Sequence, residues 1–233
     1  MCGRYTLQQA EALKRLIESL TGQKYEELMA RFNVAPTQRN PVVRADRTGG
    51  RSAGTMRWGL APLRPTGGTT EAVHFNARSE EVLAKPTFRQ AVQHRRCAVP
   101  ADGFFEWKRI NEQVRQPHLI SLRERQPFFI AGICDEATAL QPEAYALLTC
   151  GPNRLMADIH QRMPVILDGD RLERWLKPGP LSAGELASLC VPFDEKRMQA
   201  WPVGEVVNSA RHDVPACVEP VAPFVDPQGA FGF

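Results

Sequence analysis

Long apolar runs are missing from this chain of 233 residues. No stretch approaches the ~20 consecutive apolar residues that a helix needs to cross a bilayer. The first residues are polar and lack the apolar core of a secretory signal peptide. These absences argue against a helical membrane protein, and we expect a cytoplasmic protein that does not bind membranes.

Paired cysteine motifs are also absent. None of the six cysteines forms a C-x-x-C pair, which argues against a zinc ribbon or a thioredoxin-like site, so we expect no metal and no cofactor. Without a signal peptide, the even number of cysteines does not indicate disulfides. Cys97, Cys134, Cys150 and Cys190 lie in apolar runs and are expected to be small buried side chains. Cys2 differs from these four cysteines because it lies directly behind Met1.

Internal repeats and low-complexity tracts are missing as well, which argues against a solenoid and against long disordered segments. Hydrophobic residues make up 43% and charged residues 24%, as is ordinary for a globular domain. We therefore expect a single domain over residues 1–233, with the chain after Pro220 as a candidate tail, and a monomer.

Short strand-like segments dominate the chain. The predicted strands are PVVRA, TMRWGLAP, PHLISL, PFFIAGI, AYALLTC, MPVIL and EVVN, and CAVPADGFFEWKR is read as two apolar runs joined by a turn. The predicted helices cover 6–20, 87–95, 153–159, 170–177 and 182–190, and capping boxes are expected at Thr6–Gln9, Thr87–Gln90 and Ser182–Glu185. Residues 65–72 are expected to form an exposed loop.

Strands and helices do not alternate regularly, which argues against a doubly wound parallel sheet. We predict an α+β fold: a mixed, largely antiparallel, β-barrel-like sheet with short peripheral helices.

Positive charge is unevenly distributed, although the net charge is only +3. Residues 31–64 contain seven arginines, no lysine and one acidic residue, Asp46. The planar guanidinium group can donate to two phosphate oxygens in parallel. This pattern permits a nucleic-acid partner, but solvent-exposed strand and loop faces would also account for it.

Three polar residues interrupt apolar segments: Asn76 in HFNARSE, Glu106 in GFFEWK and His160 in ADIHQRMPVIL. If both faces of its strand are covered, Glu106 is a desolvated carboxyl group with a raised pKa, suited to proton transfer near neutral pH. A surface acid or a structural ion pair would explain Glu106 equally well, and a lone histidine is often a structural hydrogen-bonding group. Together, however, these residues provide proton-transfer groups and an orienting amide in a chain with a cysteine behind Met1.

Six motifs in this order resemble those of one family. MCGRYTL, FNVAPTQ, RWGLAP, FNARSE, CAVPADGFFEWK and IHQRMPVIL are similar to motifs of the SOS-response-associated peptidase (SRAP) family. That family includes the bacterial YedK-like proteins and the eukaryotic HMCES abasic-site sensors. The resemblance extends from Cys2 to about Pro220 and implies a β-barrel-like fold surrounded by helices.

The resemblance also implies a function, with a role for each matching position. Members bind single-stranded DNA that contains abasic sites, and their N-terminal cysteine bonds covalently to the lesion. The implied catalytic residues are Cys2, Asn76, Glu106 and His160, and the implied DNA-binding residues are Arg4, Arg78, Arg162, Trp58, Pro36 and Thr149. The protein would then associate with the nucleoid when it is bound to damaged DNA. The segment LRPTGG departs from the aromatic-rich stretch that often follows the W-G-x-x-P motif, so base stacking there is not expected.

The chemistry of an N-terminal cysteine fits this implication. Removal of Met1 would place a free α-amine and a thiol on adjacent carbons, and the pair can close a thiazolidine ring on the aldehyde of an opened abasic site. Glu106 would move protons, His160 would help to open the sugar, and Asn76 would orient Cys2 or the sugar. An AP-lyase-like activity is also conceivable.

Two other classes of function remain open at this level. Cys2 could be the nucleophile of a thiol peptidase that cleaves its own or another chain. Alternatively, the protein could bind single-stranded DNA without covalent chemistry, through its basic residues alone.

Overall fold

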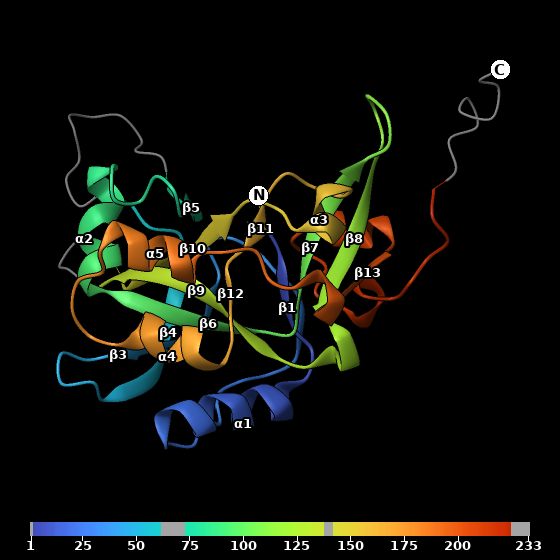
Figure 1. Cartoon of the computed structure of the whole chain (residues 1–233). Helices are drawn as coiled ribbons and strands as arrows, with labels where there is room; N and C mark the ends of the chain where they lie inside the picture. The colour runs from blue at the N-terminus through green and yellow to red at the C-terminus, as the bar shows by residue number, and fades with distance from the viewer. Residues whose placement is uncertain (1, 62–72, 138–141, 225–233) are drawn as a thin grey trace, which may run out of the picture.

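The larger of two sheets forms a closed ring of strands in the computed structural model, which describes residues 2–61, 73–137 and 142–224 (Figure 1). Its strands are β3 (Arg39–Ala45), β4 (Arg51–Trp58), β6 (Arg96–Ala101), β9 (Phe128–Asp135) and β10 (Ala144–Cys150). Hydrogen bonding runs in the order β10-β4-β3-β6-β9, and β9 pairs with β10 again. Three short strands extend the ring: β5 (Asn76–Arg78) and β11 (Met163–Pro164) on β10, and β12 (Ile166–Leu167) on β9.

The second sheet is antiparallel and carries the N-terminal segment. Its order is β13-β8-β7-β1-β2. These strands are β1 (Tyr5–Leu7), β2 (Arg31–Val34), β7 (Gly103–Arg109), β8 (Arg115–Leu122) and β13 (Met198–Pro202). Because β1 pairs with both β2 and β7, the start of the chain is held in the interior of a sheet.

Short helices surround the sheets, with α1 below them and α2 at the left of the view (Figure 1). The α-helices are α1 (Ala10–Thr21), α2 (Pro86–His94), α3 (Arg154–Ala157), α4 (Gly169–Leu176) and α5 (Ala183–Leu189). The 3₁₀ helices are η1 (Arg123–Arg125), η2 (Glu195–Arg197), η3 (Glu205–Asn208) and η4 (Pro215–Cys217). The α+β, barrel-like fold class predicted from the sequence is confirmed. Among the described helices, none combines the length and apolar character needed to cross a bilayer.

The predicted first helix was wrong at its start. Thr6 lies in β1, and α1 begins at Ala10. Thr6 does not cap the helix; its hydroxyl group donates to the buried carboxylate of Asp102 (2.6 Å). The same carboxylate accepts a hydrogen bond from the backbone N–H of Gln9 (2.7 Å). A side chain far along the sequence therefore satisfies the helix start, where an open N–H group would otherwise remain.

Two further local predictions were wrong and one was confirmed. Helix α2 begins with Pro86 after Lys85, without a side-chain cap, since proline suits the first helical position. The segment EVVN forms the 3₁₀ helix η3 and not a strand. The capping box of α5 is present: Glu185 N–H donates to Ser182 Oγ (3.2 Å), and Ser182 N–H donates to Glu185 Oε2 (2.8 Å).

An aromatic cluster in the core links the two sheets. The Trp58 ring stacks on Tyr145 at 6.2 Å between centroids and lies 5.3 Å from the tilted Tyr5 ring. The two tyrosine hydroxyl groups are hydrogen-bonded (2.9 Å), and Asn40 Nδ2 donates to the hydroxyl group of Tyr145 (3.2 Å). This cluster joins β1 to β4 and β10 and so fixes the N-terminal strand against the barrel.

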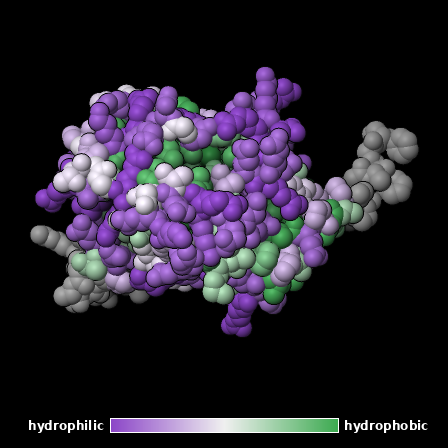
Figure 2. Space-filling view, turned by 90° about the horizontal axis from the view of Figure 1, so that it is seen from below, coloured by the Kyte–Doolittle hydropathy of each residue, from purple (hydrophilic) through white to green (hydrophobic). Residues whose placement is uncertain are grey.

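The four cysteines that were expected to be buried, Cys97, Cys134, Cys150 and Cys190, are buried, and so are Cys2 and Cys217. All six are free thiols. Hydrophilic side chains cover most of the face seen in Figure 2, with small hydrophobic areas between them. The chain from Val221 to Phe224 has no helix or strand, and both the remainder of the expected tail and the predicted loop 65–72 lie outside the described residues.

Candidate functional site

Cys2 is completely buried, three residues before β1. The backbone N–H of Phe105 in β7 donates to the carbonyl oxygen of Arg4 (3.0 Å), which continues the sheet toward the chain start. The Cys2 thiol lies 3.7 Å from the same carbonyl oxygen, and the Cys2 carbonyl oxygen accepts a hydrogen bond from Asn76 Nδ2 (2.9 Å). The position of this cysteine is therefore set by contacts on two sides.

Asn76 is placed by the barrel. It begins β5, which pairs in parallel with β10 in the register Asn76–Leu147. Its Nδ2 atom holds Cys2, whereas its Oδ1 atom is buried and has no hydrogen-bond partner among the residues that the structure describes. A buried acceptor without a partner is costly, so this atom is available to a substrate hydroxyl or an amine.

Glu106 is 2% exposed, in the interior of β7. The structure therefore supports the reading of a desolvated carboxyl group and not that of a surface acid. Burial raises the pKa of Glu106 to about 7 because the ionised form loses its hydration. This carboxyl group can both accept and donate a proton near neutral pH.

His160 follows α3 and faces Glu106. Its Nδ1 atom lies 3.8 Å from Glu106 Oε1 and accepts a hydrogen bond from the backbone N–H of Arg162 (3.0 Å). Burial lowers the pKa of His160, so its imidazole is neutral at pH 7. Two groups with different protonation behaviour are thus adjacent.

The Cys2 thiol is held in its protonated form. Its pKa is raised, first by burial and then by the negative charge of Glu106. The thiol needs a proton acceptor in order to react, and the influence of Glu106 on it places the carboxyl group in the same site.

Arg162 and Thr149 form one unit at the edge of the site. Arg162 Nη2 donates to the backbone oxygen of Thr149 (2.7 Å) and to its hydroxyl oxygen (3.2 Å). Both terminal nitrogens of Arg162 also donate to the carboxylate of Glu80. Arg78, paired in register with Thr149, is half exposed and forms an ion pair with Glu81 (3.1 Å).

The remaining predicted DNA contacts differ in accessibility. Pro36 is partly exposed after β2. Trp58 is fully buried and donates through Nε1 to the carbonyl oxygen of Phe75 (2.8 Å), next to Asn76. In this position the Trp58 ring presents no face to a nucleotide, and its contribution is to hold the strand that leads into Asn76.

Two residues of this region were missed from the sequence. Trp107 Nε1 donates to Asn208 Oδ1 (2.7 Å), and the guanidinium group of Arg4 lies 6.0 Å from the Trp107 ring centroid. Arg4 also donates to the backbone oxygen of Asn208 (3.4 Å). The position of Trp107 beside Glu106 was a usable signal, whereas Asn208 belongs to a segment that was predicted as a strand and carried no motif.

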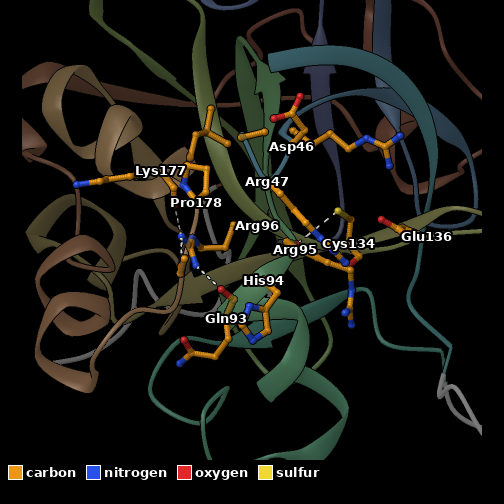
Figure 3. A pocket seen from close by; sticks show the side chains of 14 residues that line it. Asp46, Arg47, Gln93, His94, Arg95, Arg96, Cys134, Glu136, Lys177 and Pro178 are labelled. Carbon is orange, nitrogen blue, oxygen red and sulfur yellow. Dashed lines mark hydrogen bonds between the residues drawn. The ribbon is translucent and has the colours of Figure 1, made fainter. Parts of the chain in front are cut away.

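Three of the arginines of residues 31–64 form ion pairs with acidic residues that are distant in the sequence. Arg31 pairs with Asp213, Arg44 with Glu143 and Arg51 with Glu173. A cavity of about 510 Å³ lies at the ends of β3, β6, β9 and α4, and none of the predicted site residues lines it. The side chains around this cavity are drawn in Figure 3. The buried Arg96 of this cavity donates to five backbone carbonyl groups, those of Val92, Gln93, Trp175, Lys177 and Gly179. These arginines stabilise the fold, so local arginine density is a poor guide to the functional surface.

No arrangement of three or more His, Cys, Asp or Glu side chains in the described part of the chain is suited to hold a metal ion.

Comparisons with known proteins point to one family. The family model described as SOS response associated peptidase (SRAP) matches residues 1–210. The abasic site processing protein YoqW of Bacillus subtilis (strain 168) is 35% identical over 227 residues, which cover 94% of this chain and 99% of that protein. The abasic site processing protein HMCES of Rattus norvegicus is 32% identical over 198 residues, covering 71% and 56% of the two chains.

A solved structure has the same fold. A crystal structure of a protein from Bacteroides thetaiotaomicron superposes with a TM-score of 0.77 at 25% sequence identity and covers 95% of this chain and 100% of that one. By its sequence motifs, its family-model match and its relatives, the chain belongs to the SOS response associated peptidase (SRAP) family.

Proposed function

We propose that this protein processes abasic sites in single-stranded DNA by a covalent bond from Cys2, formed after removal of Met1, and so shields the lesion. The observation that carries the proposal is the buried Cys2, whose carbonyl oxygen accepts a hydrogen bond from Asn76 Nδ2 and whose thiol is under the electrostatic influence of Glu106. The names of the relatives, abasic site processing proteins, support the choice of lesion.

The proposed reaction needs no oxidant and no external group. The α-amine of Cys2 adds to the aldehyde carbon of the opened sugar, and loss of one water gives an imine. The thiol then adds across the C=N bond: sulfur bonds to carbon, and its proton ends on nitrogen. The product is a thiazolidine, and the sum of the steps is aldehyde plus aminothiol giving thiazolidine plus water.

The site residues have separate roles in this scheme. Glu106, with its pKa of about 7, donates a proton to the departing hydroxyl group and takes the proton of the thiol. Neutral His160 acts on the sugar oxygens during ring opening. Asn76 Oδ1 accepts a hydrogen bond from the amine of Cys2 or from the sugar.

DNA is held by phosphate contacts. Arg4, Arg78 and Arg162 each follow a proposed catalytic residue by two positions, and arginine suits phosphate because it donates two parallel hydrogen bonds. Thr149 fixes the guanidinium group of Arg162 (2.7 Å), and Pro36 is a further proposed DNA contact. Contacts of this kind position single-stranded DNA without reading its sequence.

A denaturing gel tests the proposal. The protein is incubated with a single-stranded oligonucleotide that has one abasic site and, in parallel, with the intact oligonucleotide. We expect a heat-stable adduct only with the abasic strand, whose mass is that of both partners minus Met1 and one water. Cys190→Ser, which removes a buried thiol elsewhere, serves as the matched control and should crosslink normally.

Other results would support one of the alternative functions. Tight binding of both strands without an adduct would leave only a non-covalent DNA-binding protein. Cleavage of a peptide that depends on Cys2, with no DNA adduct, would favour the thiol peptidase. Strand scission at the abasic site would indicate lyase chemistry through the imine.

A further inference from the structure

Two glutamates follow the NAR motif in the turn after β5 and pair with arginines assigned to phosphate. The carboxylate of Glu80 accepts hydrogen bonds from Arg162 Nη1 (2.5 Å) and Nη2 (2.9 Å). The carboxylate of Glu81 accepts from Arg78 Nη1 (3.1 Å) and also pairs with Lys85. Both carboxylates thus form ion pairs with cationic side chains at the edge of the site.

The contact between Glu80 and Arg162 has the geometry of a bound phosphate. Two parallel hydrogen bonds between a guanidinium group and two oxygens are common to carboxylate and phosphate recognition. The terminal nitrogens of Arg162 cannot form this contact with Glu80 and with a phosphate at once. A DNA phosphate that binds there in the same way must replace the carboxylate.

Glu80 is not needed to hold Arg162 in place. Thr149 already fixes Arg162 through its backbone oxygen (2.7 Å) and its hydroxyl oxygen (3.2 Å), and the Arg162 side chain is only 15% exposed. The side chain of Glu80, in contrast, is 53% exposed. The arginine is therefore the fixed partner and the glutamate the replaceable one.

Glu80 also has space to move. It lines a cavity of about 430 Å³ whose wall includes Leu83, Cys150, Leu186 and Cys190. Ion pairs at exposed positions contribute little, equivalent to a factor of about 1.4 to 5 in an equilibrium constant. A polyanion that also contacts Arg4 and Arg78 can overcome such a factor. A single weak anion makes fewer contacts when it replaces the Glu80 carboxylate, so it gains less binding free energy.

Building on the proposed DNA binding, we infer that Glu80, assisted by Glu81, is a specificity-determining residue that competes with phosphate for Arg162. In the free protein its carboxylate neutralises the arginine, and on DNA binding a phosphate group displaces it. The competition selects ligands that present several phosphates along a strand over isolated phosphate groups.

The test uses the Glu80→Gln variant and intact single-stranded DNA, so that binding is measured without chemistry. Glutamine keeps the size of the side chain but removes the charge, and we expect Kd to fall by about 2- to 5-fold. The matched control is Glu143→Gln, which removes the same charge from the pair with Arg44 (3.1 Å) and should leave Kd nearly unchanged. Inorganic phosphate, added as a competitor, should inhibit Glu80→Gln more strongly than wild type.

A double-mutant cycle with Arg162→Ala completes the test. The gain from Glu80→Gln should disappear in the Arg162→Ala background. An equal gain in both backgrounds, or in Glu143→Gln, would reduce the effect to net charge, and weaker binding by Glu80→Gln would make Glu80 a positioning residue; each result overturns the inference. If Arg162→Ala binds DNA as tightly as wild type, the proposed phosphate contact itself fails, a result distinct from failure of the competition.

Discussion

Replacement of Glu106 by glutamine separates the chemistry of the site from its architecture. The side chain is 2% exposed, and its pKa rises from 4.5 to about 7 because burial disfavours the charged form. This rise corresponds to about 3 kcal/mol of free energy of unfolding, which is lost as the pH rises from 4.5 to about 7 and the carboxyl group ionises in the unfolded chain but not in the folded protein. Glutamine has nearly the same shape but never ionises, so the variant avoids this loss.

The direction of the pH dependence follows from proton binding. Between pH 4.5 and about pH 7 the folded protein keeps a proton on Glu106 that the unfolded chain has released. The contribution of Glu106 to stability therefore falls as pH rises through this window and stays low above it. We expect Glu106→Gln to gain about 3 kcal/mol relative to wild type between about pH 4.5 and about pH 8, as measured by urea unfolding at a series of pH values.

The same variant should be slow in crosslinking. Loss of general acid–base catalysis predicts a rate lower by roughly 10²–10⁴-fold in single-turnover assays, with affinity for intact DNA retained because a carboxylate does not bind phosphate. Glu173→Gln is the control, because Arg51 lowers the pKa of that surface carboxyl group and no gain at high pH is expected. A stability difference that does not change with pH would refute the raised pKa, and a wild-type rate at every pH would remove Glu106 from the mechanism.

Three further changes probe other parts of the molecule. Cys2→Ser keeps the amine but loses sulfur, so its adduct should be labile to heat unless borohydride reduces the imine; a heat-stable adduct without reduction would contradict the thiazolidine. Arg78→Ala should weaken binding of single strands of any sequence and make the affinity less dependent on salt, because one phosphate contact is lost; an unchanged salt dependence in fluorescence anisotropy titrations would contradict this. Asp102→Ala leaves the Thr6 hydroxyl and the Gln9 N–H without their acceptor and should lower the free energy of unfolding by about 1–3 kcal/mol in urea; an unchanged urea midpoint would show that water replaces the carboxylate.

Much of the barrel could be predicted from local pattern. PFFIAGI and AYALLTC are continuous apolar runs, typical of strands covered on both faces, and they form β9 and β10 of the ring. Glu106 stood out for a related reason. It is a carboxyl group in an otherwise apolar strand segment, and the bulky aromatic residues beside it indicate that the strand is covered.

The errors arose where distant residues decide local structure. Thr6 and Gln9 resemble a capping box, yet Asp102, 96 and 93 residues away, takes both hydrogen bonds and lets Thr6 join β1. Trp58 was assigned to DNA contact because its motif resembles one of the SRAP family, but sequence does not distinguish an aromatic ring that lies beside a site from one that is buried beneath it. Asn208 reaches Arg4 and Trp107 only through the tertiary fold.

The way β5 is held has a consequence for how the chain can vary. Its register is set by β10, through Asn76–Leu147 and Arg78–Thr149, and not by the residues that lead into it. Before β5, Leu60 and His74 form an isolated bridge that brings the two ends of the intervening segment together. Residues can therefore be inserted or deleted between Leu60 and His74 without moving Asn76 away from Cys2. The length of this connection can therefore differ among related chains while the reactive centre stays constant.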